Sequence, residues 1–378
     1  MRYVYTKNHI IFKEQIFYCE AKLNIDEKKS FKKFCDSSTM RVETPKPIIS
    51  VLISSFKRKE FILDCLNSLF HQTLERNKFE IVVVKNYVDQ KIDSFMKREG
   101  IVVVHSTSER FGSQIIEGIE SSQGDLIAFL DDDDRFHEDK LKRIIEIFSL
   151  RRDLSYLHNE QLIIDVNGKK LLNLGRRIRK TEERIVNNEQ REDLVVKSIL
   201  RTPRIFHNNS SVTIRRDMLY GKKEYLEKIE TSLDLFLFFC AIQSKKELDF
   251  IPDKLTEYRL HNSESNSTII SKTTASKLIA LLERQMVTLK VIKNMSSGSF
   301  FLIYVDQQVL LTEMRLSVLN GSYRGFYLKN LNLRHLFTYR FYPFSEVISW
   351  LFFYLVGKMA PSLSRSWYLK FRTLTTIY

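Results

Sequence analysis

Cysteine, proline and glycine are all scarce in this chain, with 4 Cys, 6 Pro and 11 Gly among 378 residues. The cysteines form no Cys-x-x-Cys pair and show no metal-ligand spacing, which excludes a disulfide-stapled fold and favours free thiols in a reducing compartment. The low glycine and proline content excludes collagen-like and low-complexity chains. The N-terminal segment is interrupted by charge and lacks the apolar run of a secretory signal, so we expect a cytoplasmic protein.

Apolar and basic residues are abundant instead. Hydrophobic residues make up 43% of the chain and charged residues 28%, a balance that can bury a large core. The 60 Lys and Arg exceed the 46 Asp and Glu, which gives a net charge of +14. Such an excess favours an anionic partner, namely nucleic acid, an acidic membrane surface or a phosphorylated ligand. The net charge alone does not choose among these three.

Strand and helix patterns alternate from residue 47 onward. Continuous apolar, β-branched runs such as IISVLI predict strands buried on both faces, and apolar residues at helical spacing predict helices between them. This alternation predicts an α/β fold with a mostly parallel sheet flanked by helices. The expected strands are 48–53, 79–84, 101–104 and 125–130, and helices are expected at 61–70, from Gly112 and from about His137.

Three regions follow from these patterns. Residues 1–46 form an N-terminal extension that ends at the Pro-containing boundary TPKP. Residues 47–270 form the α/β domain, in two halves, 47–150 and 151–270. Helical spacing at 275–293 and 300–319 predicts that residues 271–378 are a helical C-terminal region.

The end of the chain is basic and aromatic. From Ser322 onward there are eight Lys or Arg against Glu346 alone, interleaved with aromatic residues. Its apolar stretch, 347–356, has about ten residues, well short of the roughly 20 that a helix needs to cross a bilayer. A basic, aromatic-rich segment of this kind fits the interface of an anionic membrane. A helix packed on the protein's own core, or in a dimer interface, is the alternative.

Four aspartates, Asp131 to Asp134, directly follow the apolar run DLIAFL. Adjacent carboxylates repel one another, so a divalent cation would compensate their charge. The carboxyl end of a strand is also where open α/β sheets bind ligands. A hard cation held by carboxylates and substrate phosphates, Mg²⁺ or Mn²⁺, is typical of nucleotide chemistry. The alternative is an acidic turn that caps the following helix.

Four segments carry a further signal, ISVLISSFKR, LNSLFHQT, FEIVVV and GSQIIEGIESSQGDLIAFLDDDD. In this order, residues 47–150 resemble a family 2 glycosyltransferase with the GT-A fold. The resemblance implies nucleotide binding in 47–150 and acceptor binding in 151–270. It also implies a Mn²⁺- or Mg²⁺-dependent, inverting transfer of a sugar from a nucleotide-diphosphate donor to a glycan or lipid-linked hydroxyl. We expect such a protein on the inner face of the cell membrane.

On the donor side, Asp131 and Asp133 match the family's D-x-D positions. The match implies that Asp131 lies near the donor ribose or the metal and that Asp133 binds the metal, with Asp134 toward the acceptor. The turn after the first strand is where the family contacts the nucleotide; the alternative is a polar turn with Arg58 in solvent. The nucleotide-sugar-binding residues that we expect are Ser54, Ser55, Arg58, Asn86, Asp131 and Asp132.

On the acceptor side, ETSLDLFLFFCAI and YRLHNSESNS resemble the family's acidic segment and its Y-R-x-H stretch. An inverting transfer needs a carboxylate to accept the acceptor's proton, and we expect Asp234 to be this base, its pKa raised by burial in the apolar run. Glu230 competes, because aligning on LDLFL puts Ser232 at the family's first Asp. His261 is implied as a third metal ligand or pyrophosphate contact, and His158 is a weaker acceptor-side candidate. Helix capping by Asp234 and a structural His261 are the alternatives.

The sequence departs from the family's pattern at the end of the second strand. In the family this strand commonly ends in an acidic residue that touches the base. Here FEIVVV runs into Lys85, which cannot accept a hydrogen bond, so base recognition is expected to shift to Asn86 or Asp89. Loss of the acid supports a rival hypothesis, a catalytically silent partner of another transferase, which the retained aspartates oppose. In a nucleic-acid-binding protein the negatively charged aspartate cluster would repel the phosphate backbone. We therefore expect no nucleic-acid partner.

Overall fold

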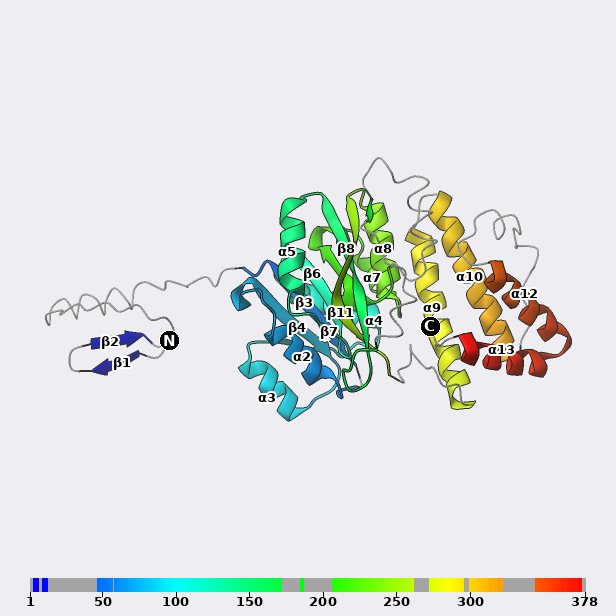
Figure 1. The fold of residues 1–378 in the computed structure, drawn as a ribbon, viewed down its shortest axis with the longest axis horizontal. Helices are drawn as coiled ribbons and strands as arrows, with labels where there is room; N and C mark the ends of the chain where they lie inside the picture. The colour runs from blue at the N-terminus through cyan, green and yellow to red at the C-terminus, as the bar shows by residue number, and fades with distance from the viewer. Residues whose placement is uncertain are drawn as a thin grey trace. The chain divides into compact units, whose positions relative to one another are not determined.

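The computed structural model describes residues 3–6, 9–12, 46–56, 58–171, 184–186, 206–261, 272–295, 299–321 and 344–375. The chain divides into two compact units, Met1–Pro45 and Lys46–Tyr378. In the first unit, β1 (Tyr3–Thr6) pairs antiparallel with β2 (His9–Phe12). The second unit holds a large sheet, the helices around it and a C-terminal group of helices (Figure 1).

The first half of the large sheet is parallel, as the alternating pattern predicts. In β3, Val51 and Ile53 pack into one hydrophobic cluster and Leu52 into another, because successive side chains of a strand point to opposite faces. The spatial order is β5-β4-β3-β6. The strands are β3 (Ile49–Ser55), β4 (Phe79–Lys85), β5 (Val102–His105) and β6 (Leu126–Asp131). The helices are α2 (Ile62–Phe70), α3 (Gln90–Arg98), α4 (Phe111–Glu120) and α5 (Lys140–Leu150).

Antiparallel strands extend the sheet beyond β6. β10 (Val212–Arg215) lies between β6 and β8 (Leu154–Ile164) and is antiparallel to both. β11 (Glu247–Arg259) runs parallel to β8 and also pairs with β7 (Arg135–Phe136) and β9 (Arg184–Val186). The sheet is thus mixed, and β10 brings the segment before it next to the end of β6.

A close approach requires glycine at the start of α4. A Cβ on Gly112 would lie 1.8 Å from the carbonyl oxygen of Leu226, the last residue of α7 (Lys223–Leu226). The Gly112 N–H donates to the carbonyl of Ile229 at 3.0 Å, which ties the two segments together. A larger side chain here would push α4 away from the chain that leads to the main helix of residues 206–261.

That main helix, α8 (Leu233–Gln243), is apolar on nearly every side. Phe236, Phe238 and Phe239 are all buried, and Phe238 stacks on Phe206 with 4.7 Å between the ring centroids. A helix that is hydrophobic all round belongs in the interior. Here it fills the space between the sheet and the C-terminal helices, since its residues share a cluster with Val212 of β10 and with Leu289.

The C-terminal region is helical, as its spacing predicts. α9 and α10 pack on the domain core, for example through Leu289 and Val305, and they share a further cluster with α12 and α13 that includes Met314 and Tyr354. In the described part of the chain, no helix combines the length and apolar character needed to span a bilayer. The helices are α9 (Lys272–Met295), α10 (Ser299–Asn320), α12 (Phe344–Met359) and α13 (Pro361–Thr375).

Candidate active site

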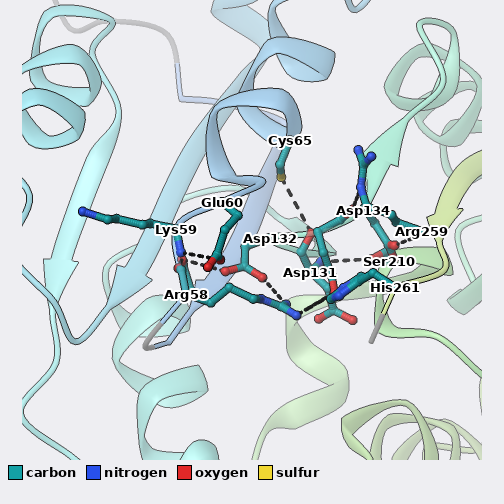
Figure 2. Close-up of polar contacts among 12 residues, drawn as sticks. Arg58, Lys59, Glu60, Cys65, Asp131, Asp132, Asp134, Ser210, Arg259 and His261 are labelled. Carbon is teal, nitrogen blue, oxygen red and sulfur yellow. Dashed lines mark hydrogen bonds and ion pairs between the residues drawn. The ribbon is translucent and has the colours of Figure 1, made fainter. Parts of the chain in front are cut away.

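The four aspartates occupy the turn between β6 and β7, at the carboxyl end of the parallel strands. Asp131 lies beside Ser54 of β3 in the sheet register, so the turn after β3 reaches the cluster. The Asp134 N–H donates to the Asp131 carbonyl at 3.1 Å and closes the turn. Figure 2 shows Arg58 and His261 converging on the aspartates. The structure thus brings together the donor-side residues predicted after two different strands.

Asp132 is buried and held by the turn after β3. Ser55 Oγ donates to Asp132 Oδ2 at 2.8 Å, and the Arg58 guanidinium forms an ion pair with Oδ1. Ser55 Oγ also lies 3.0 Å from the Tyr87 hydroxyl. Burial raises the pKa of Asp132, although the charge of Arg58 opposes the rise. Asp132 therefore fixes Arg58 at the cluster, and the arginine does not simply extend into solvent.

Asp133 receives two partners on one oxygen. His261 Nε2 donates to Asp133 Oδ2 at 2.6 Å, and Arg58 Nη1 lies 2.9 Å from the same atom. Burial opposes ionisation of this carboxyl, but the hydrogen bond from His261 and the charge of Arg58 lower the pKa of Asp133 overall. Asp133 is thus the carboxylate of the cluster that is most readily ionised.

Asp131 contacts the loop before β10. Its carboxylate oxygens accept from Asn209 Nδ2 at 3.2 and 3.3 Å, and its backbone N–H donates to Ser210 Oγ at 2.9 Å. Burial and the charge of Asp133 raise the pKa of Asp131 to about 7, against the opposing hydrogen bond from Asn209. Asn209 and Ser210 are therefore site residues, although no sequence motif marks them.

Asp134 is held by a hydrogen bond from Arg259, the last residue of β11. Asp134 is 1% exposed, and its Oδ1 accepts the Arg259 N–H at 2.9 Å, whereas its Oδ2 has no hydrogen-bond partner within the described ranges. The buried Arg259 guanidinium donates to the Asp133 carbonyl at 2.7 Å and forms an ion pair with Asp64. Burial and the charges of Asp133 and Asp131 raise the pKa of Asp134 well above its usual range.

Three of these carboxylates are spaced to bind one cation. One oxygen each from Asp131, Asp133 and Asp134 lies within 4.8 Å of the others. Oxygen ligands suit a hard cation such as Mg²⁺ or Mn²⁺, and the unpartnered Asp134 Oδ2 is an atom that such a cation would satisfy. His261 holds Asp133 by a hydrogen bond, which is how a partner residue commonly orients a ligating carboxylate.

A buried lysine supports the loop that contacts Asp131. Lys140 is fully buried, and its Nζ donates to the Ser210 carbonyl at 2.5 Å and to Thr256 Oγ1 at 2.9 Å. The same Nζ lies 3.8 Å from the centroid of the Phe136 ring. Burial lowers the pKa of Lys140 well below its usual range. In the sequence Lys140 is one of several lysines near an amphipathic helix, and nothing there distinguishes it.

Asp234 lies in the first turn of α8, next to the same loop. Its Oδ2 accepts the Asn208 N–H at 2.9 Å, and its own N–H donates to Asn209 Oδ1 at 2.9 Å. Because Asn209 also donates to Asp131, one amide side chain links the donor aspartate to the predicted base. The Asp234 side chain is only partly buried, contrary to the expectation from its apolar neighbours, because the helix begins at the edge of the core.

Glu230 and Ser232 precede α8 in the same segment. The Glu230 N–H donates to Thr288 Oγ1 of α9 at 3.2 Å, and Ser232 adopts a left-handed backbone with φ of 55°. Both residues are half-buried. Left-handed backbone at a non-glycine residue is uncommon and clusters at functional sites. Glu230 accordingly stays the alternative to Asp234.

Comparison with known proteins agrees with this geometry. Residues 50–196 match the model described as Glycosyl transferase family 2. This part of the chain is therefore similar to glycosyltransferase family 2. Among curated relatives, the chain is 28% identical over 113 residues to the Putative glycosyltransferase EpsH of Bacillus subtilis, a match that covers 29% of the chain and only 32% of the relative. It is 24% identical over 235 residues to an uncharacterized glycosyltransferase of Nostoc, covering 60% of the chain and 68% of the relative.

Among solved structures, the chain resembles S. aureus TarS. The TM-score is 0.50 at 17% identity for TarS 1-349, covering 74% of this chain and 76% of that chain. For the longer TarS structure it is 0.51 at 15% identity, covering 83% of this chain and 53% of that chain. At this identity the likeness concerns the fold, and it confirms the GT-A architecture that the sequence resemblance implies.

Lys85, at the end of β4, points into the protein interior. Lys85 is fully buried, forms an ion pair with Asp93 of α3, and its Nζ lies 4.4 Å from the centroid of the Tyr87 ring. Of the two candidates for base recognition, Asn86 is exposed after β4. Asp89 caps α3 by accepting from Lys91 and Ile92 and also pairs with Lys59. The acid that the family uses at this strand end is thus replaced by an internal ion pair.

His158 lies in β8 and is buried, at 5% exposure. Its Nε2 donates to the carbonyl oxygen of His207 at 2.9 Å. Burial lowers the pKa of His158 from 6.5 to about 3, although the hydrogen bond to His207 opposes this change. The ring is therefore neutral at pH 7 and supports the loop before β10 from within the sheet.

We expect His158 to make the protein less stable in mild acid. The unfolded chain takes up a proton on this ring below pH 6.5, whereas the folded chain does so only near pH 3, so the unfolded state binds more protons between these values. The free energy of unfolding should then fall by about 1.4 kcal/mol per pH unit as the pH drops through this window. This pH dependence can be measured by urea unfolding of the wild type and of His158→Gln at pH 4.5, 5.5 and 7. Gln keeps a donor for His207, and an identical pH dependence in both proteins would contradict the assignment.

Proposed function

We propose that this chain is a family 2 glycosyltransferase, which moves a sugar from a nucleotide-diphosphate donor to a hydroxyl acceptor, with a divalent metal and inversion at the anomeric carbon. The observation that carries the proposal is the grouping of Asp131, Asp133 and Asp134 within 4.8 Å at the carboxyl end of the parallel strands. Ligand sites of open α/β sheets lie at this end. The family match over residues 50–196 supplies the reaction class.

The donor set fits Mn²⁺ or Mg²⁺. Asp131, Asp133 and Asp134 would hold the ion, and the unpartnered Asp134 Oδ2 would gain a partner. When bound, such an ion neutralises the negative charge of a diphosphate leaving group. His261 and Arg58 keep Asp133 ionised and oriented for this purpose. Arg58, with 31% of its side chain exposed, also offers a cation beside the diphosphate.

The acceptor side centres on Asp234. An inverting transfer is one displacement, in which the acceptor hydroxyl attacks as its proton passes to a carboxylate. Asp234 is linked to the donor aspartate through Asn209, so the two carboxyl groups lie in one connected site. The Asn208 and Leu235 N–H groups donate to Asp234 and hold its orientation. We assign the acceptor to the class of glycans or lipid-linked saccharides, presented at the inner face of an anionic membrane.

A panel of UDP-, GDP- and dTDP-sugars tests the proposal. With Mn²⁺ or Mg²⁺ present, at least one donor at about 100 times its Kd should stabilise the fold by about 2.7 kcal/mol, a rise in melting temperature of a few degrees. EDTA should abolish that rise and the hydrolysis of the same donor. The matched control is the corresponding nucleoside without phosphates. If no donor of the panel changes the melting temperature in either metal, the assignment is wrong.

A further inference from the structure

Two C-terminal helices expose a row of large apolar side chains. Phe352, Leu355 and Met359 of α12 and Leu363 and Trp367 of α13 are all exposed, and Met359 is 90% exposed. Isolated exposed apolar residues are ordinary on a protein surface, but a contiguous group marks a site of interaction. We call these five residues the apolar face.

The spacing of these residues places them on one side of the helix pair. In α12 they recur at i, i+3 and i+7, and in α13 at i and i+4, which are the periods of a single helix face. The rings of Phe352 and Trp367 are stacked, with 6.2 Å between centroids and 4° between planes, and so join the two helices. The neighbouring Tyr354 and Tyr368 point into the cluster shared with α9 and α10. The opposite side of α12 and α13 therefore packs into the core.

The charge around the apolar face is positive. Lys358, three residues after Leu355 in α12, is exposed beside it. The sequence of α12 and α13 contains four basic residues, Lys358, Arg365, Lys370 and Arg372, against Glu346. A protein partner of mixed charge would not call for such one-sided cations, whereas anionic lipid headgroups would. Aromatic rings and flexible cationic side chains beside an apolar strip are the composition of helices that lie in a membrane interface.

We propose that the apolar face enters the headgroup region of an anionic bilayer, with α12 and α13 lying along the membrane surface. Phe352 and Trp367 would sit at headgroup depth, Met359 at the corner between the helices would penetrate furthest, and Lys358 would reach back to lipid phosphates. This deepens the membrane location included in the proposed function by naming the surface and the lipid class. It does not depend on the transfer chemistry.

Vesicle binding by the full chain tests this surface. Flotation with vesicles of phosphatidylglycerol and phosphatidylcholine should recover the protein, and pure phosphatidylcholine vesicles should recover far less. Leu355→Glu with Met359→Glu should lower the partition coefficient at least tenfold. Leu150→Glu, at a site 86% exposed on α5, is the matched control and should change nothing. Lys358→Gln should weaken binding about fivefold, as the loss of about 1 kcal/mol per cation predicts, whereas the exposed Lys142→Gln should not.

Trp367 gives a direct readout of insertion. The chain has two tryptophans, so Trp350→Phe leaves Trp367 as the single reporter. Its emission should shift to the blue with anionic vesicles and be quenched by brominated lipid. Equal binding of the Glu variants, or no quenching, would overturn the proposal. A dimer in light scattering that the Glu variants dissociate would reassign the face to a second copy of this chain. Donor-induced thermal shift, measured on the same variants, reports separately on the proposed transfer.

Discussion

Asp133→Asn should reduce kcat/KM for sugar transfer by about three orders of magnitude. The pKa of Asp133 is lowered, and His261 and Arg58 both contact its Oδ2. Among the three carboxylates proposed to hold the cation, it is therefore the one most fully ionised. Loss of one preorganised electrostatic contact at developing charge typically costs about 10² to 10³ in rate, and loss of a metal ligand adds to that through weaker binding of the ion. Steady-state kinetics over a Mn²⁺ titration measures both parts.

The matched control for Asp133→Asn is Asp253→Asn. Asp253 is an exposed aspartate that pairs with Arg143 at 3.0 Å and lies outside the cluster. Its replacement should leave kcat/KM within about twofold, because exposed ion pairs contribute little. His261→Gln should fall between the two, since Gln can still donate to Asp133 Oδ2. Full activity of Asp133→Asn without added metal would show that the cluster serves another purpose.

The order of strands and helices could be predicted because it is encoded locally. Runs such as IISVLI and FEIVVV become β3 and β4, buried on both faces, with bounds that differ from the expected ones by one or two residues. The antiparallel course of β10 could not be predicted in this way. It depends on the pairing of Val212 with His158 and of Thr213 with Ala128, contacts between residues far apart in the chain.

The candidate site likewise combines residues that local sequence reveals with residues that only the tertiary fold brings in. The aspartate cluster and the turn with Arg58 are contiguous in sequence and carry a recognisable motif. Asn209 and Arg259 reach the cluster from two other elements, and Lys140 holds the loop that carries Asn209. Their roles depend on the tertiary fold that brings these segments together. Lys85 illustrates the reverse case. From the sequence, Lys85 indicates only that base recognition shifts to another residue, and nothing predicts that its side chain turns inward to pair with Asp93 of α3.

The link through Asn209 connects the proposed donor and acceptor sides. Its amide nitrogen donates to Asp131, and its carbonyl oxygen accepts from the Asp234 N–H. Asn208, with φ of 84°, and the buried Lys140 fix the backbone on either side of it. A displacement of the loop would thus move the donor contact and the predicted base together. This coupling makes Asp234 the more informative of the two candidate bases.

Asp234→Asn should lower kcat by about 10² to 10⁴, the range that a general base contributes, with little change in donor binding. Asn keeps a carbonyl oxygen that can accept the Asn208 N–H, so the loop and the fold should survive, which an unchanged melting temperature would confirm. Glu230→Gln is the matched control, since Glu230 lies in the same segment, and it should cost less than about fivefold. Donor-induced thermal shift checks that the donor still binds to both variants. If Glu230→Gln shows the large loss and Asp234→Asn does not, the proton passes to Glu230, and Asp234 acts only as the residue that holds Asn208 and Asn209.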